Sequence, residues 1–259
     1  MDVRKLNAEM VAPEFFEVAG LKLALFSAKG TRAVGDKNED SCGFVRYGGK
    51  QVALVVSDGL GGHEMGARAS KIAVGTTLGK VVKKRRRIKS YEFLDRIEKS
   101  HQKILALGIN AGATLVAALI EESKIRFYAV GDSSGFLISD QGEIEYKTLE
   151  HSVVGLAKEA GVLGAKAAKN HQESHVILNC LGFWDSRVET SFELELRPRN
   201  TLVLCSDGLT EVFTKKEIIS KLAGVPFEHG VIGLLEGVMR RRCSREFVDD
   251  MTFILCQRI

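Results

Sequence analysis

Apolar residues occur along the chain in short, separate runs, each long enough for one β-strand and bounded by glycine or polar residues. The runs predict strands at residues 21–26, 52–56, 114–120, 126–130, 135–139, 201–205 and 251–256. Longer stretches between them have the spacing and composition of amphipathic helices. They predict helices at residues 66–82, 91–107, 152–160 and 215–222, the last continuing through 231–241.

The order of these elements favours an α+β fold, with helices packed on antiparallel sheets, over a doubly wound parallel sheet. Strands and helices do not alternate strictly, and a short polar segment joins the runs 114–120 and 126–130, as expected for an antiparallel hairpin. The chain has only 3 prolines and no linker rich in glycine, serine or proline. We therefore expect one domain over residues 21–259, with residues 1–20 as an N-terminal extension packed on it.

Aspartates stand at the ends of several predicted strands. The run 52–56 leads directly into the segment SDGLGGH, and three further runs have an aspartate at one end. A single Asp-Gly after a strand is most often a turn. Four such carboxylates, if they converge, would raise one another's pKa values unless a cation neutralised them. These aspartates are Asp58, Asp132, Asp207 and Asp249, and a further acidic pair, Glu39 and Asp40, follows the first predicted strand.

The residue types around these aspartates favour Mg²⁺ or Mn²⁺ over zinc. Carboxylate, carbonyl and water oxygens are hard ligands, whereas zinc calls for histidine or cysteine at recognisable spacing. Gly59 lets the backbone approach an ion closely and offers its carbonyl as a ligand. Two ions sharing a carboxylate could deprotonate a water and orient a phosphate ester for in-line attack. His63 could then protonate the leaving alkoxide, although a lone histidine is more often a surface residue.

Composition and charge narrow the class of protein only modestly. A net charge of +4 on 259 residues indicates neither a nucleic-acid nor a membrane partner, and the basic runs at 81–90 and 240–245 lack interleaved aromatic residues that would stack on bases. The 5 cysteines are scattered, which suggests a reducing compartment. No stretch approaches the roughly 20 apolar residues that span a bilayer, and the start of the chain lacks a signal-peptide pattern, so we expect a cytoplasmic protein.

Eight motifs follow one another along nearly the whole of residues 21–259. They are Asn38-Glu39-Asp40, DGLGGHEMGARAS (58–70), GATLVAALI (112–120), VGDSSGFLI (130–138), EHS (150–152), HVILNCLG (175–182), LVLCSDGLTEV (202–212) and DDMTFILC (249–256). In this order they resemble the metal-dependent protein serine/threonine phosphatases of the type 2C family, in the form of a compact bacterial-style catalytic domain. Any one motif is weak, but eight in family order are specific.

The resemblance implies a four-layer α-β-β-α sandwich, in which two antiparallel sheets stack face to face between helices and a binuclear metal site lies at one edge. It implies hydrolysis of phosphoserine and phosphothreonine by direct attack of a metal-bound hydroxide. The cofactors would be two tightly bound Mg²⁺ or Mn²⁺ ions and a third, weaker one. The partners would be phosphorylated proteins and a cognate serine/threonine kinase or its targets, with no nucleic acid and no membrane, and we expect a monomer.

The resemblance also assigns roles to single residues. Asp58 would bridge the two ions, Gly59 would contribute its carbonyl, and Glu39 would reach metal through water. Asp132 would hold the third ion together with Asp207, and His63 matches the proposed general acid. The full set of metal residues is Glu39, Asp40, Asp58, Gly59, Asp132, Asp207 and Asp249.

The chain departs from the family pattern at two positions beside this site. Gly35 stands where the family usually has an arginine that holds the substrate phosphate, and we hypothesise that Arg32 supplies this contact, because an ammonium on Lys37 would not reproduce a bidentate guanidinium clamp. Ala67 stands where a glutamate is common. Two alternatives follow: an inactive pseudo-phosphatase that binds a regulator through the same fold, and a phosphatase for small-molecule phosphates that uses the same metal chemistry.

Overall fold

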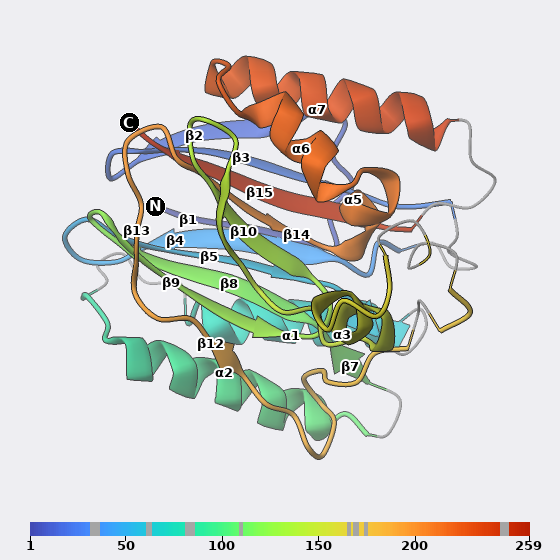
Figure 1. Cartoon of the computed structure of the whole chain (residues 1–259). Helices are drawn as coiled ribbons and strands as arrows, with labels where there is room; N and C mark the ends of the chain where they lie inside the picture. The colour runs from blue at the N-terminus through green and yellow to red at the C-terminus, as the bar shows by residue number, and fades with distance from the viewer. Residues whose placement is uncertain are drawn as a thin grey trace.

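Two antiparallel β-sheets stack face to face, and helices cover the outer face of each (Figure 1). The structure is a computed structural model, and it describes residues 1–31, 37–60, 64–80, 86–108, 111–164, 167, 171–173, 176–243 and 249–259. Helices α5, α6 and α7 lie on one side, at the top of the figure, and α1 and α2 lie on the other. The α+β sandwich with two stacked antiparallel sheets is therefore confirmed.

The first sheet has the strand order β1-β4-β5-β8-β9-β12, with β13 also paired to β9. Strands β8 and β9 form the antiparallel hairpin that the sequence predicts. The strands are β1 (Asp2–Leu6), β4 (Ser41–Arg46), β5 (Gln51–Ser57), β8 (Leu115–Glu121), β9 (Lys124–Val130), β12 (Glu189–Thr190) and β13 (Leu194–Glu195).

The second sheet has the strand order β11-β10-β14-β15-β3-β2. Its longest pairing joins the two ends of the chain, since β3 and β15 run antiparallel over eight residues each. The strands are β2 (Glu14–Val18), β3 (Leu21–Ala28), β10 (Ser134–Ile138), β11 (Ile144–Lys147), β14 (Thr201–Cys205) and β15 (Met251–Arg258).

A third, two-stranded sheet and the helices complete the described elements. The short strands are β6 (Gly59–Leu60) and β7 (Gly112–Ala113). The helices are α1 (Glu64–Thr77), α2 (Ser90–Leu105), α3 (Val153–Glu159), α5 (Asp207–Val212), α6 (Lys215–Leu222) and α7 (Phe227–Arg242). Within the described part of the chain, no helix combines the length and the apolar character needed to cross a membrane.

The central strands are buried on both faces, which explains their unbroken apolar runs. In β5, Leu54 and Val56 point into the layer between the sheets, whereas Ala53 and Val55 pack under α1 and α2. This alternation follows from the two-residue period of a strand. A strand covered on both sides reads as a continuous apolar segment instead of an alternating one.

The fold contains strands that were not predicted, among them β4 of the first sheet, and it divides one predicted helical stretch. Residues 1–20 contribute edge strands, β1 to the first sheet and β2 to the second, where charged residues in short segments concealed the strand pattern. The predicted helical stretch over 215–241 is two helices, α6 and α7. Gly224 has a left-handed φ of +69° and Pro226 caps α7, so the chain turns between them.

Candidate metal centre

Five aspartates from five separate segments gather at one edge of the sandwich. Asp58 lies between β5 and β6, and burial raises its pKa well above the usual range. The charges of four further aspartates raise this pKa in addition, with the effect decreasing in the order Asp40, Asp207, Asp249 and Asp132. The four strand-end aspartates and Asp40, which the sequence singles out, therefore act on one another across the folded structure.

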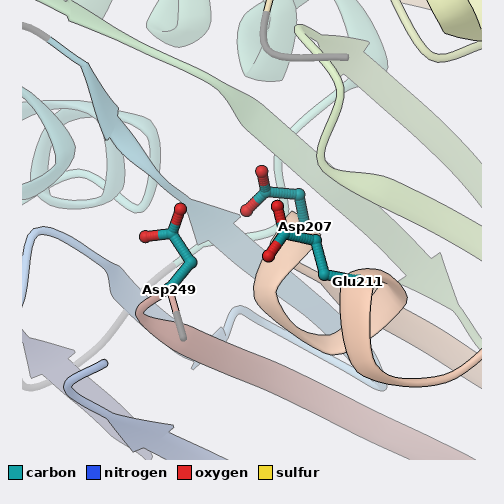
Figure 2. Close-up of side chains that lie close together, drawn as sticks. All are labelled: Asp207, Glu211 and Asp249. Carbon is teal, nitrogen blue, oxygen red and sulfur yellow. The ribbon is translucent and has the colours of Figure 1, made fainter. Parts of the chain in front are cut away.

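Two of these aspartates and one glutamate lie close together in Figure 2. Asp207 is the first residue of α5, Glu211 lies one turn later on the same helix, and Asp249 precedes β15. One carboxylate oxygen of each lies within 4.8 Å of the others. Glu211 is not among the predicted site residues, although its four-residue spacing from Asp207 places both on one helix face.

Several carboxylate oxygens in the cluster are buried without a hydrogen-bond partner. These atoms are Oδ1 of Asp40, Asp132 and Asp207. Burial raises the pKa of Asp132 to about 6, and Asp207 also titrates well above its usual range, again because of burial first and neighbouring charges second. An unpaired buried polar oxygen is costly unless a cation satisfies it. The all-oxygen donor set fits Mg²⁺ or Mn²⁺.

Asp40 is held so that its two oxygens have different surroundings. Its Oδ2 accepts a hydrogen bond from the Ser206 hydroxyl at 2.7 Å, while Oδ1 has none. Burial and then the nearby Asp250 charge raise the pKa of Asp40 to about 7. Ser206 also caps α5 and is bonded to Thr252 of β15, so the same serine links Asp40 to the elements that carry Asp207 and Asp249.

The adjacent Asp249 and Asp250 have different roles. Both oxygens of Asp250 accept backbone hydrogen bonds, from Gly30 N at 2.7 Å and from Glu39 N at 2.6 Å. Asp250 therefore braces the loop that carries Glu39, whereas Asp249 faces Asp207.

Gly59 of β6 and Gly66 in the first turn of α1 allow their backbones to approach each other and the acidic loop. A Cβ on Gly59 would lie 2.1 Å from the Gly66 carbonyl oxygen, and a Cβ on Gly66 would lie 2.9 Å from Oε2 of Glu39. Neither contact is possible for a larger residue without movement. The Gly59 carbonyl and the Glu39 carboxylate thus lie together beside Gly66 at the start of α1.

The remaining predicted residues have no described partner at the centre. His63, Arg32 and Gly35 lie outside the described residues. The side chain of Lys37 is 62% exposed and lies 3.7 Å from Glu64. Ala67 is buried in α1.

The N-terminal segment supports Asp40 from behind. Asn7 has a left-handed φ of +51°, and both its backbone N–H and its side-chain amide donate to the Asp40 carbonyl, at 3.0 and 3.1 Å. The same amide also donates to the hydroxyls of Ser41 and Ser70. Asn7 is therefore a positioning residue for Asp40.

Asn7→Ala is expected to raise the metal concentration needed for half-maximal activity by about tenfold, because residues that orient metal ligands typically contribute this much. The measurement is phosphatase activity against Mn²⁺ concentration. Glu14→Ala is the matched control, since it removes the Lys5 ion pair of the same segment without touching Asp40. Equal metal requirements in the two variants would contradict the positioning role.

Stacked antiparallel sheets with a cluster of aspartates at one edge define a metal-dependent phosphoester hydrolase, because two-metal carboxylate sites suit in-line attack on phosphorus. The model of the protein phosphatase 2C family matches residues 29–231. The chain therefore belongs to the protein phosphatase 2C family, which confirms the class of enzyme that the eight motifs indicate.

Individual relatives agree with this assignment. The serine/threonine phosphatase Stp of Listeria innocua is 31% identical over 193 residues, 70% of this chain and 75% of the relative. The crystal structure of Stp1 from Staphylococcus aureus has a TM-score of 0.75 and 26% identity, covering 95% of this chain and 99% of its own. The catalytic domain of the phosphatase PstP, solved in complex with two manganese ions, shares the fold with a TM-score of 0.73 and 24% identity over 92% of this chain and 97% of its own.

Proposed function

We propose that this chain hydrolyses phosphoserine and phosphothreonine esters of proteins with Mg²⁺ or Mn²⁺ as cofactor. The observation that carries the proposal is the position of Asp58, whose carboxylate is buried among the charges of Asp40, Asp207, Asp249 and Asp132. Cations would neutralise this arrangement at neutral pH, where ionised carboxylates repel one another. The named activity of the Listeria relative, serine/threonine phosphatase, supports the same substrate class.

The residues of the cluster would divide between two tight ions and a third, weaker one. When bound, the pair of ions would offset the charge of the phosphate and lower the pKa of a water molecule, so that the deprotonated water could serve as the nucleophile and no covalent enzyme intermediate would be needed. Asp58 would bridge the pair. The other ligands of the pair would be Asp40, Asp207, Asp249 and the Gly59 carbonyl, with Glu39 acting through water, and the weaker ion would take Asp132, Asp207 and Glu211.

Hydrogen bonds of the surrounding chain hold these ligands in place. The backbone N–H of Asp58 donates to Thr114 Oγ1 at 3.0 Å, and the N–H of Thr114 donates back to the Asp58 carbonyl at 2.9 Å. Thr114 Oγ1 lies 2.7 Å from the hydroxyl of Ser133, the residue after Asp132. One threonine thus couples the position of Asp58 to that of Asp132.

His63 is proposed to protonate the leaving alkoxide, and Arg32 is proposed to hold the substrate phosphate. We expect His63→Ala to slow hydrolysis of an alkyl phosphoester by about a hundredfold, the usual contribution of a general acid. The rate with p-nitrophenyl phosphate should change far less, because its leaving group needs little protonation. Equal losses on both substrates would assign His63 a structural role.

The deciding experiment is release of phosphate from a phosphothreonine peptide in EDTA, Mg²⁺ and Mn²⁺, with Asp207→Asn in parallel. Activity that requires metal and is lost in the variant supports the proposal. Folded protein that releases no phosphate from any substrate would instead favour the pseudo-phosphatase. Activity on small phosphate esters but on no phosphopeptide would favour the small-molecule alternative.

A further inference from the structure

A cavity of about 760 Å³ opens beside the C-terminal turn of α2. One wall is formed by α2, and the other by the loop over residues 178–186. The lining is largely apolar, with Asn179 and Asp185 among the polar residues. Its main apolar residues are Leu105, Ala106, Leu178, Phe183 and Trp184.

This loop is joined by hydrogen bonds to the strand beside the metal centre. Leu181 exchanges two backbone hydrogen bonds with Ala113 of β7, at 3.0 and 2.8 Å. On its other side, Ala113 pairs with Gly59 of β6, the residue after Asp58. Two strand spacings of about 4.8 Å place the loop backbone about 10 Å from Gly59. The cavity therefore adjoins the catalytic edge.

A second set of contacts anchors the same loop to the Asp132 segment. Asn179 Nδ2 donates to His151 Nδ1 at 2.9 Å, and the Gly131 N–H donates to the same nitrogen at 3.1 Å. The backbone N–H of His151 donates back to the Gly131 carbonyl at 2.9 Å. Because Gly131 directly precedes Asp132, the wall of the cavity and the metal centre share a rigid support.

Several large apolar side chains that line the cavity are exposed to solvent. Trp184, the only tryptophan of the chain, is 88% exposed, Leu178 is 52% exposed and Phe183 is 44% exposed. Clustered exposed apolar side chains next to a functional site are typical of a binding surface. The exposed Asp185 carboxylate at the same cavity disfavours an acidic occupant.

We propose that this cavity is a substrate subsite that binds a large apolar side chain of the phosphoprotein, a conclusion that rests on the proposed function. The polypeptide on either side of a phosphorylated residue at the metal centre must cross the adjoining surface. The loop backbone at Leu181 lies about 10 Å from Gly59, and an extended chain advances about 3.3 Å per residue, so the cavity on the other side of this loop is about three or more residues away along a bound peptide. The occupant is the side chain at this position relative to the phosphorylated residue.

The test uses the full chain with Mn²⁺ and phosphothreonine peptides in which one position at a time carries Leu, Phe or Ala, over about four residues on each side of the phosphothreonine. We expect kcat/KM to favour Leu or Phe over Ala at one such position by about tenfold, as apolar pockets commonly do. Trp184→Ala should bring this ratio close to one, and Trp184→Phe should restore part of it.

Tyr91→Ala is the matched control, because Tyr91 is an exposed aromatic residue at the opposite end of α2 and lies outside the cavity lining. It should leave the ratio unchanged. The wild-type chain gives a second readout that needs no variant, since binding of the preferred peptide should shift the fluorescence of its single tryptophan to shorter wavelength.

The outcomes separate the subsite from the proposed function. If the wild-type protein hydrolyses p-nitrophenyl phosphate and shows the same kcat/KM for all the peptides, the proposed function stands and the subsite is refuted. A positional preference that survives in Trp184→Ala, or a tryptophan signal that no peptide changes, would also overturn it. If the folded protein hydrolyses no phosphoester, both the proposed function and the subsite are refuted.

Discussion

Asp58→Asn is expected to abolish phosphatase activity, with a loss of at least about a thousandfold, and to weaken metal binding at the same time. Losses of this size accompany removal of a central catalytic group. Asp58 is the residue whose pKa is raised by the charges of all four other aspartates, as expected for the proposed shared ligand of the two tight ions. Activity assays and calorimetric titration with Mn²⁺ measure the two effects.

The same substitution should stabilise the metal-free protein. Asparagine is nearly isosteric with aspartate, and it removes one of the like charges that crowd this edge. We therefore expect the melting temperature in EDTA at neutral pH to rise while activity disappears, a known trade-off at strained functional sites. A variant that loses activity because it unfolds would show a lower melting temperature, and normal turnover would refute the bridging role.

Glu211→Gln is the comparison that distinguishes a central ligand from a peripheral one. Glu211 lies near Asp207 and Asp249, and its charge raises the pKa values of Asp132 and Asp207, whereas the charges that most raise the pKa of Asp58 are those of the four other aspartates. We expect its substitution to reduce activity at low metal concentration and high metal concentration to restore most of it. A loss of activity as severe as that of Asp58→Asn, which high metal concentration did not restore, would contradict a peripheral role for Glu211.

The sequence singled out Asp58, Asp132, Asp207 and Asp249 because each stands beside an apolar run that was predicted to be a strand. Glu211 was not predicted as a site residue because α5 has only six residues, which is too short for a helical period to be recognised. Asp249 and Asp250 could not be told apart from their order alone. Their roles depend on which carboxylate the Gly30 and Glu39 amides reach, and that contact spans more than 200 residues of sequence.

The strand pairings also differ in how far the sequence could predict them. The hairpin of β8 and β9 follows from adjacent apolar runs, and it was predicted from the residues directly. The pairing of β3 with β15 joins the start and the end of the chain, and no local pattern specifies such a partner. The four-layer arrangement was therefore available from the family resemblance, and the edge strands β1 and β2 were missed because local hydrophobicity does not mark them.

Without metal, the protein is expected to become less stable as the pH rises from about 5 to about 8. The folded-state pKa values of Asp40 and Asp132 are raised to about 7 and about 6, above the ordinary value of 3.8. A raised pKa means that the folded state binds more protons than the unfolded state between these values. The associated stability is complete at low pH and is lost as the pH rises through the folded-state pKa.

The size of this effect is large for a single site. A difference of one pKa unit corresponds to about 1.4 kcal/mol. Between about pH 5 and the folded-state pKa values of about 7 and about 6, Asp40 therefore contributes on the order of 3 kcal/mol and Asp132 on the order of 1 kcal/mol. At about 2–4 °C per kcal/mol, the melting temperature in EDTA should fall by on the order of 10 °C across this range. Glu150 acts in the opposite direction, because Lys215 and Lys158 outweigh its burial and lower its pKa to about 2. Its contribution therefore changes only below about pH 5.

Divalent metal should reverse this trend. At about pH 8 Asp40 and Asp132 are charged and free to bind Mn²⁺, so saturating metal should raise the melting temperature strongly, whereas at about pH 5 protons compete with the metal and the rise should be small. Thermal unfolding at both pH values, with EDTA or Mn²⁺, measures the four states. Asp40→Asn should flatten the EDTA profile, because it removes one of the raised groups. A metal-free wild-type protein that becomes more stable with rising pH over this range would show that the aspartates do not crowd one another in solution.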